Sequence, residues 1–250
     1  MTKSGLNGRR IYGACALMFT GLAGAILGIV GLEPPADLLK EAPLSAETFK
    51  TLSIIQSGVL VIAGVAAGYF LTPRLGLTSI IVDGRPTFQI SILWFVFIGA
   101  VAGLGIWALD AVLTAHWPAL ASFHTQNAAE LAEMETHASA VTRLAYGGVV
   151  EEILARYGVM SGLALMFLST LKNKALALGL AIFTSSVLFG VGHLPAVFAF
   201  VADPPTAFLI KVVALNTLAA AVFASAFTAH SLEAAMLSHI GFHLGLMVLS

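Results

Sequence analysis

The sequence has almost no cysteine and very little charge. Cys15 is the single cysteine in 250 residues, which excludes an internal disulfide framework and a cysteine-based zinc cluster. Only 10% of the residues are charged, against about 25% in a soluble domain, while 58% are hydrophobic. The formal net charge of −1 gives no indication of nucleic-acid binding. We therefore expect an integral membrane protein that contacts the lipid bilayer and no nucleic acid.

Several common catalytic patterns are also missing. The chain contains no His-Glu-x-x-His, which removes the commonest zinc-peptidase helix, and no Gly-x-Ser-x-Gly, which argues against a serine nucleophile. Asp110 is a single acid within an apolar run, so an aspartyl pair has no second member. The sequence shows no internal repeat of the kind found in many carriers.

Long apolar runs predict an all-α, polytopic fold with about seven transmembrane helices. Pro34, Pro73 and Pro204 mark predicted helix ends. Residues 1–140 would hold the first three spans and a polar connecting segment, and residues 141–250 a catalytic core of four helices. The predicted spans are 11–32, 52–71, 88–113, 141–170, 175–201, 206–229 and 231–250.

Basic residues near the ends of the spans predict the orientation. With seven spans, most of them fall on the same side as the amino terminus, which we therefore place in the cytoplasm. We expect the plasma (inner) membrane of a prokaryote. The residues on this side are Lys3, Arg9, Arg10, Arg74, Arg85, Lys172 and Lys174.

The connecting segment 114–140 is the most polar part of the chain and holds three of the seven histidines, His116, His124 and His137. Asn127 followed by Glu130 resembles a helix-starting cap, so we expect a short surface helix here. We expect the histidines to lie in solvent. Glycine pairs four residues apart predict close helix packing within the spans, namely 24 and 28, 64 and 68, and 99 and 103.

Three ionisable residues lie together in the fourth predicted span. A charged side chain near the bilayer centre costs roughly 2.5–3.5 kcal/mol, so a cluster of this kind indicates function. Arg156 follows Glu152 by four residues, so the two share a helix face and can neutralise one another. Glu151 points elsewhere and is left without a local partner, as expected of a general base. The alternative is an ion pair that only fixes helix packing.

Histidines lie in two later spans. His193 follows Gly190 and Gly192, which leave room for another backbone or a substrate, and His239 and His243 share one face of the last helix. Such a histidine pair can bind a metal or stabilise an oxyanion. Counted along their helices, Glu151, His193 and His239 reach the same membrane depth within roughly 5 Å. The sequence therefore predicts one shared site.

Three stretches in this order, Glu-Glu-x-x-x-Arg at 151–156, Phe-x-x-x-His at 189–193 and His-x-x-x-His at 239–243, resemble the CPBP family. This is the CAAX-protease and bacteriocin-processing (Abi) family of intramembrane endopeptidases. The resemblance covers the chain from about residue 140 to its end. It implies that Arg156 fixes Glu152. His243 is a departure, because the family usually carries Asn or Asp there.

The resemblance implies that Glu151, helped by His193, activates a water that attacks a peptide bond in a membrane-associated protein or peptide. His239 and His243 would stabilise the oxyanion, and no cofactor would be required. Alternatively, Glu151, His193, His239 and His243 would form a zinc shell, so the enzyme is either a glutamic or a metal-dependent peptidase.

Two further classes of function compete with the peptidase. A non-proteolytic membrane scaffold or regulator with the same fold is motivated by the departure at His243. A proton- or ion-coupled carrier is the third class, since Glu, Arg and His also build proton relays. The sequence does not indicate the substrate or the oligomeric state.

Overall fold

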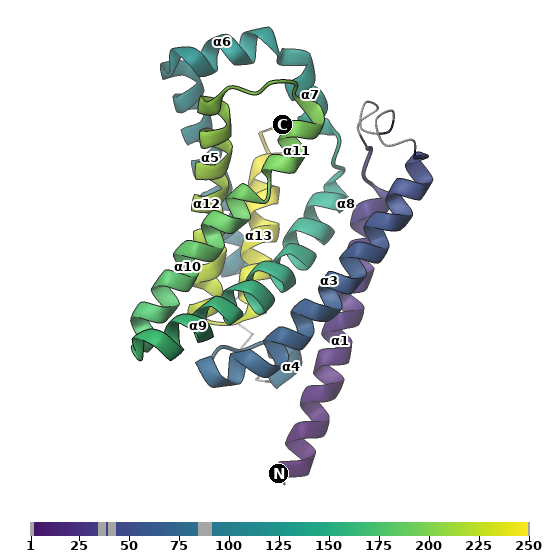
Figure 1. Cartoon of the computed structure of the whole chain (residues 1–250), viewed down its shortest axis with the longest axis vertical. Coiled ribbons are helices and arrows are strands. Elements are labelled where there is room, and N and C mark those ends of the chain that lie inside the picture. The colour runs from purple at the N-terminus through teal and green to yellow at the C-terminus, as the bar shows by residue number, and fades with distance from the viewer. Residues whose placement is uncertain (1–2, 35–38, 40–43, 85–91, 250) are drawn as a thin grey trace.

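The computed structural model describes residues 3–34, 39, 44–84 and 92–249, and every regular element among them is a helix (Figure 1). This confirms the predicted all-α fold. The elements are α1 (Lys3–Val30), α3 (Ala46–Leu75), α4 (Ile80–Asp83), α5 (Ile92–His116), α6 (Pro118–Gln126), α7 (Ala128–Thr136), α8 (Ala140–Thr142), η1 (Arg143–Glu151), η2 (Ile153–Met160), α9 (Ser161–Leu171), α10 (Lys174–Val191), α11 (Leu194–Phe200), α12 (Thr206–Ala229) and α13 (Leu232–Met247).

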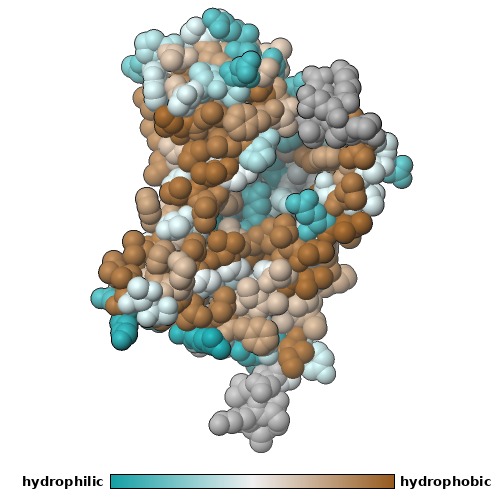
Figure 2. Space-filling model, viewed as in Figure 1, coloured by the Kyte–Doolittle hydropathy of each residue, from teal (hydrophilic) through white to brown (hydrophobic). Residues whose placement is uncertain are grey.

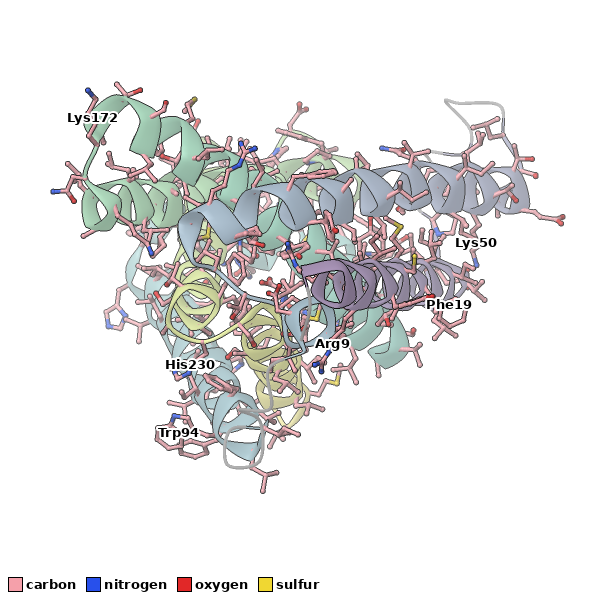
Figure 3. All side chains as sticks on the ribbon, turned by 90° about the horizontal axis from the view of Figure 1, so that it is seen from below. Arg9, Phe19, Lys50, Trp94, Lys172 and His230 are labelled. Carbon is pink, nitrogen blue, oxygen red and sulfur yellow. The ribbon has the colours of Figure 1, made fainter. Side chains whose placement is uncertain are left out.

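Six helices in the described part of the chain are long and apolar enough to cross a membrane. Large apolar side chains point outward from them, for example Phe19, 75% exposed, and Trp94, 58% exposed (Figure 3). Such side chains suit contact with lipid, as expected of an integral membrane protein. The seventh predicted span corresponds to α13, which has 16 residues, fewer than the roughly 20 of a typical span. The count of seven therefore stays a prediction.

The second helix differs from its prediction at both ends. It begins at Ala46, where the hydroxyl of Ser45 accepts a hydrogen bond from the backbone N–H of Thr48. It continues past Pro73 and ends at Leu75, because Gly76 adopts a left-handed conformation and its N–H bonds the last carbonyls. The predicted start of the third span, at residue 88, lies outside the described residues.

The predicted glycine contacts are confirmed, and the tightest join α5 to α13. A Cβ atom at Gly99 or Gly103 would collide with backbone atoms of Ser238 and Phe242. Gly241 is pressed in the same way against Val96 of α5. These contacts allow two helix backbones to touch and place α13 in the interior of the bundle (Figure 1).

The fourth span contains two π-helical segments, η1 and η2, on either side of Glu152. π-helical turns are rare and frequently occur at functional sites. Around them, the main hydrophobic core takes Leu17 from α1, Val61 from α3, Ile153 from η2 and Phe223 from α12. Helices from both predicted parts of the chain thus share one core, and the proposed division at residue 140 stays a prediction.

Helices α6 and α7 form a cap at one end of the bundle (Figure 1). A separate small core, which includes Leu120, Phe123, Val197 and Phe208, attaches this cap to α11 and α12. The short helix expected after Asn127 is α7, and Asn127 occupies its N-cap position. The side chain makes no capping bond, because its amide donates to the carbonyl of Phe123 in the preceding helix.

Candidate active site

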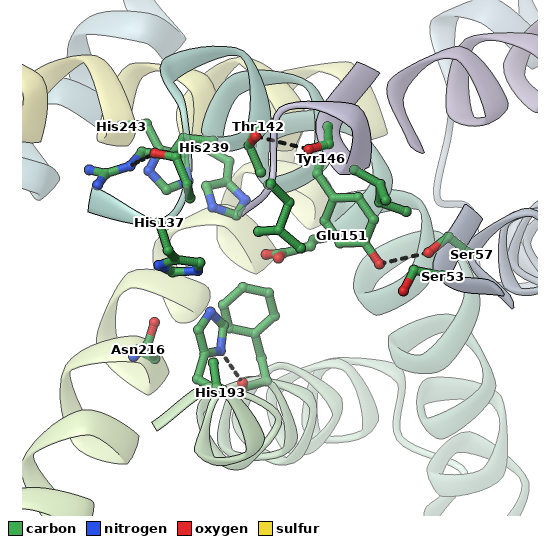
Figure 4. A pocket seen from close by; sticks show the side chains of 18 of the residues that line it. Ser53, Ser57, His137, Thr142, Tyr146, Glu151, His193, Asn216, His239 and His243 are labelled. Atoms are coloured by element: carbon green, nitrogen blue, oxygen red, sulfur yellow. Dashed lines mark hydrogen bonds between the residues drawn. The ribbon is translucent and has the colours of Figure 1, made fainter. Parts of the chain in front are cut away.

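A cavity of about 540 Å³ opens between the α1–α3 pair and the α10–α13 helices. Figure 2 shows hydrophilic residues in a hollow in the middle of a largely hydrophobic face. Glu151, His193, His239 and His243 all line this cavity, and their side chains point toward a common space (Figure 4). The structure therefore brings together four of the predicted site residues in one place. Three separate helical segments, η1, the α10–α11 junction and α13, supply them.

Glu152 and Arg156 lie behind the cavity wall and form the predicted ion pair. Arg156 Nε is 3.1 Å from Oε2 of Glu152, and both side chains are fully buried. The guanidinium also lies over the rings of Phe189 and Phe223, with its carbon 5.0 Å and 6.0 Å from their centroids. A buried charge is stable only when it is paired, so each member of this pair holds the other in place.

Glu152 has a second partner that the sequence did not reveal. Nδ1 of His239 donates to Oε1 of Glu152 over 3.0 Å. The imidazole is further fixed by stacking on Phe223, with ring centroids 4.3 Å apart. Because the hydrogen bond fixes the proton on Nδ1, the other ring nitrogen, Nε2, is left to face the cavity. Glu152 thus orients His239 and is itself held by Arg156.

His193 lies at a break between two helices. α10 ends at Val191, His193 occupies the junction, and α11 begins at Leu194. Its Nδ1 donates to the carbonyl of Phe189 over 2.8 Å, so Nε2 carries the lone pair of the neutral ring. Gly190 lets the backbone of α12 approach, because a Cβ there would meet the carbonyl of Val213. The predicted close approach at this glycine is confirmed.

His243 stacks on His239, with ring centroids 4.9 Å apart. Gly147 makes room for it, because a Cβ at position 147 would lie 2.7 Å from Nε2 of His243. Its Nδ1 is buried without a hydrogen-bond partner. The first glycine of the Gly147-Gly148 pair is therefore required by the site itself.

Glu151 ends η1 and lines the cavity half-buried. Within the described residues its carboxylate makes no hydrogen bond or ion pair, which confirms the predicted lack of a local partner. Tyr146 lines the cavity beside it, and its hydroxyl contacts the Ser57 hydroxyl of α3 at 3.1 Å. A free carboxylate next to hydroxyl groups can hold and polarise a water molecule.

The predicted zinc shell does not fit this arrangement. In the part of the chain that the structure describes, no group of three or more His, Cys, Asp or Glu side chains is placed to hold a metal ion. The bonds from Nδ1 of His193 to Phe189 and from Nδ1 of His239 to Glu152 leave each Nε2 free, so the misfit lies in the placement of the side chains and not in their nitrogen atoms. We derive no catalytic step through a metal.

Sequence reasoning did not identify Asn216 on α12 or His137 as residues of the cavity (Figure 4). The prediction that His137 lies in solvent is wrong, because the segment after α7 folds over the cavity. There the ring packs on Phe200, with centroids 4.5 Å apart. Asn216 is a polar residue in an apolar span, which is the signal that would have found it.

Lys211 was also missed, and it corrects the prediction for His124. Its ammonium lies 2.7 Å from a carboxylate oxygen of Asp110, which therefore has a partner in the bundle. It also donates to Nε2 of His124 over 3.0 Å, so His124 is not simply solvated. Burial, and then Lys211, lower the pKa of His124. His116 is exposed, as predicted.

Residues 135–245 match the family model of type II CAAX prenyl endopeptidases, described as Rce1-like. No curated protein and no solved structure matched the chain. The matched segment runs from the end of α7 through most of α13 and includes all six predicted site residues. The match confirms, for residues 135–245, the resemblance to the CPBP family of CAAX-type membrane proteases.

Proposed function

We propose that the protein is an intramembrane endopeptidase that hydrolyses a peptide bond in a membrane-associated protein or peptide. One observation carries the proposal. The unpaired carboxylate of Glu151 shares a cavity with His193, His239 and His243, while the neighbouring acid Glu152 is wholly engaged behind the wall. Two adjacent carboxylates thus have different environments, which is how proteins assign them different roles.

In the proposed reaction, Glu151 takes a proton from a water molecule that also hydrogen-bonds Nε2 of His193. The water oxygen forms a bond to the carbonyl carbon of the scissile peptide, and negative charge moves to the carbonyl oxygen. The carbon–nitrogen bond then breaks, and the proton held by Glu151 passes to the leaving nitrogen. The products are one carboxyl group and one amine.

The oxyanion would be stabilised by His239 and His243. Because Nδ1 of His239 is bonded to Glu152, its Nε2 can donate only when the ring is an imidazolium. The carboxylate of Glu152 stabilises that charge, as an acid behind a catalytic histidine does. Arg156 pairs with Glu152 and holds it in position. The positions of these groups are fixed before the substrate enters, which avoids a reorganisation cost in the transition state.

The surroundings of the site support a membrane-associated substrate. A second cavity of about 340 Å³, between η2 and α10, also reaches Glu151 and His193. Its remaining lining is largely apolar and includes Leu154, Val159 and Leu188. Val159 and Leu188 are exposed on the bundle surface, where lipid would lie. An apolar part of a substrate could therefore reach the site laterally from the bilayer.

The proposal is tested with the purified full chain in liposomes and a farnesylated CAAX reporter peptide. A comparison of membrane-protein cleavage in cells with and without the protein extends the search to other substrates. Glu151→Gln and His193→Ala should abolish cleavage in both assays while the thermal unfolding profile is kept. Glu133→Gln and His116→Ala change exposed residues outside the cavity, so cleavage should remain at the wild-type level in both control variants.

A scaffold or regulator of the same fold would behave differently. Its partner-dependent phenotypes would persist in Glu151→Gln, because removal of one proton-accepting oxygen leaves the outer surface unchanged. Cleavage that persists in both Glu151→Gln and His193→Ala would remove the peptidase.

A further inference from the structure

Three polar side chains of the cavity wall, His193, Asn216 and His137, direct a hydrogen-bond donor to a carbonyl of their own helix or segment. Nδ1 of His193 donates to the carbonyl of Phe189, and the side-chain amide of Asn216 donates to the carbonyl of Val212 over 2.9 Å. Nδ1 of His137 likewise bonds the carbonyl of Met134. In each case the remaining polar atom of the side chain is an acceptor.

Arg143, the cationic residue on this wall, also directs two of its nitrogens to carbonyls of the protein. Its guanidinium donates to the carbonyls of Ala138, over 3.2 Å, and Glu135. Burial, and to a smaller degree Arg143, lower the pKa of His137, although its bond to Met134 acts in the opposite direction. The ring is therefore neutral near pH 7, and its Nε2 carries a lone pair. His137 and Asn216 thus each present an acceptor atom to whatever binds in the cavity.

A peptidase substrate brings the complementary groups. A transmembrane or interfacial helix must be unwound before its peptide bond can be attacked, and unwinding frees backbone N–H groups from their helical partners. Away from bulk water each unpaired N–H is costly, so the enzyme has to supply acceptors. Asn216 lies on the cavity wall with its oxygen on the side of His137 (Figure 4).

We propose that Asn216 Oδ1 and His137 Nε2 bind main-chain N–H groups of the unwound substrate next to the scissile bond. The inference rests on the proposed peptidase function and adds two substrate-binding residues to it. Asn216 comes from α12 and His137 from the segment after α7, so an extended chain between them would cross the cavity in front of His193. Neither residue takes part in proton transfer.

The test uses the inactive Glu151→Gln protein in liposomes and measures the dissociation constant of a farnesylated CAAX peptide. Asn216→Leu, added to it, removes the acceptor at similar volume and should weaken binding about five- to tenfold, the usual effect of one hydrogen bond. Asn216→Asp keeps an acceptor oxygen and should bind more tightly than Asn216→Leu. His137→Phe keeps the ring on Phe200 and should behave like Asn216→Leu.

Asn127→Leu is the matched control, because the Asn127 amide makes the same bond to the carbonyl four residues earlier, at Phe123, but lies outside the cavity. A set of peptides in which one amide at a time is replaced by an ester removes single N–H groups. One of these esters should bind Asn216→Leu and the parent protein equally well. For that ester the difference in affinity between the two proteins disappears. If Asn216 had only a structural role, Asn216→Leu would weaken the binding of every peptide in the set.

The outcomes separate this inference from the peptidase proposal. Equal affinities of Asn216→Leu, His137→Phe and the parent protein for the amide peptide would overturn the inference, and so would the absence of binding. Binding that depends on Asn216 without any cleavage by the wild-type protein would leave the inference standing and count against the peptidase.

Discussion

Nδ1 of His239 lies 3.0 Å from Oε1 of Glu152, although 87 residues separate the two in the chain. The other oxygen of Glu152 faces Arg156 at 3.1 Å. One buried carboxylate therefore joins two helices and holds a histidine whose second nitrogen faces the cavity. The second glutamate of the pair is thus a positioning residue for His239, in addition to being the partner of Arg156.

This network predicts how stability responds to substitution. Glu152→Ala should lower the free energy of unfolding by about 3–5 kcal/mol, because it leaves the Arg156 charge buried and unpaired. The double variant Glu152→Ala, Arg156→Met should lose less than the sum of the two single changes. Chemical unfolding in detergent, followed by circular dichroism, measures the free energy of unfolding of the two single variants and the double variant. Additive losses would contradict the coupling.

Gly147 should be required for activity rather than for folding. Gly147→Ala places a methyl group 2.7 Å from Nε2 of His243 and should shift that ring from its place beside His239. We expect cleavage of the reporter peptide to fall about tenfold or more, since small displacements at an active site are costly. Gly162→Ala, where the methyl group meets open space, is the control. Equal activity in the two variants would refute the predicted role of Gly147.

The contact between His124 and Lys211 should make stability depend on pH. In the fold, the pKa of His124 lies below its ordinary value of 6.5, so the unfolded chain binds the proton more readily. This contribution to stability is complete above pH 6.5 and is lost as the pH falls through 6.5 toward the lowered pKa.

His124→Gln keeps an acceptor for Lys211 but does not titrate. Between about pH 7.5 and about pH 5.5, its melting temperature should therefore fall less than that of the wild type. His116→Gln changes an exposed histidine and should follow the wild type. Parallel curves for the wild type and His124→Gln would exclude His124 as the titrating group.

Catalysis by Glu151 without a metal predicts resistance to chelators. A catalytic zinc site needs about three protein ligands, and the cavity histidines are not arranged as such a set. Cleavage should therefore survive dialysis against phenanthroline, and the purified protein should contain less than one equivalent of zinc by mass spectrometry. Activity that phenanthroline removes and zinc restores would favour the metallopeptidase alternative.

Much of the site could be predicted because it depends on local spacing. The four-residue step from Glu152 to Arg156 places both on one helix face in any helical context, and the pair forms as expected. His239 and His243 share a face for the same reason. Helix length and burial cost then implied that charged residues in three spans gather at one depth.

The predictions for two histidines of the connecting segment failed, because their surroundings depend on long-range contacts. His124 and His137 lie in polar sequence, where local composition favours solvent exposure. In the fold, a small apolar core around Phe123 and Phe208 draws the segment onto the bundle, and each histidine meets a partner from elsewhere in the chain. Composition does not encode which surfaces meet, so this burial could not be read from it.

The sequence by itself determined that the chain lies in a membrane, that its helices carry costly ionisable groups, and which of these share a helix face. These properties follow from the apolar content and from the 3.6-residue repeat. The tertiary structure alone decided that Glu152 holds His239, that Lys211 pairs with Asp110, and that Asn216 and His137 complete the cavity wall. Such contacts depend on how helices far apart in the chain pack and rotate against one another, which no local spacing specifies.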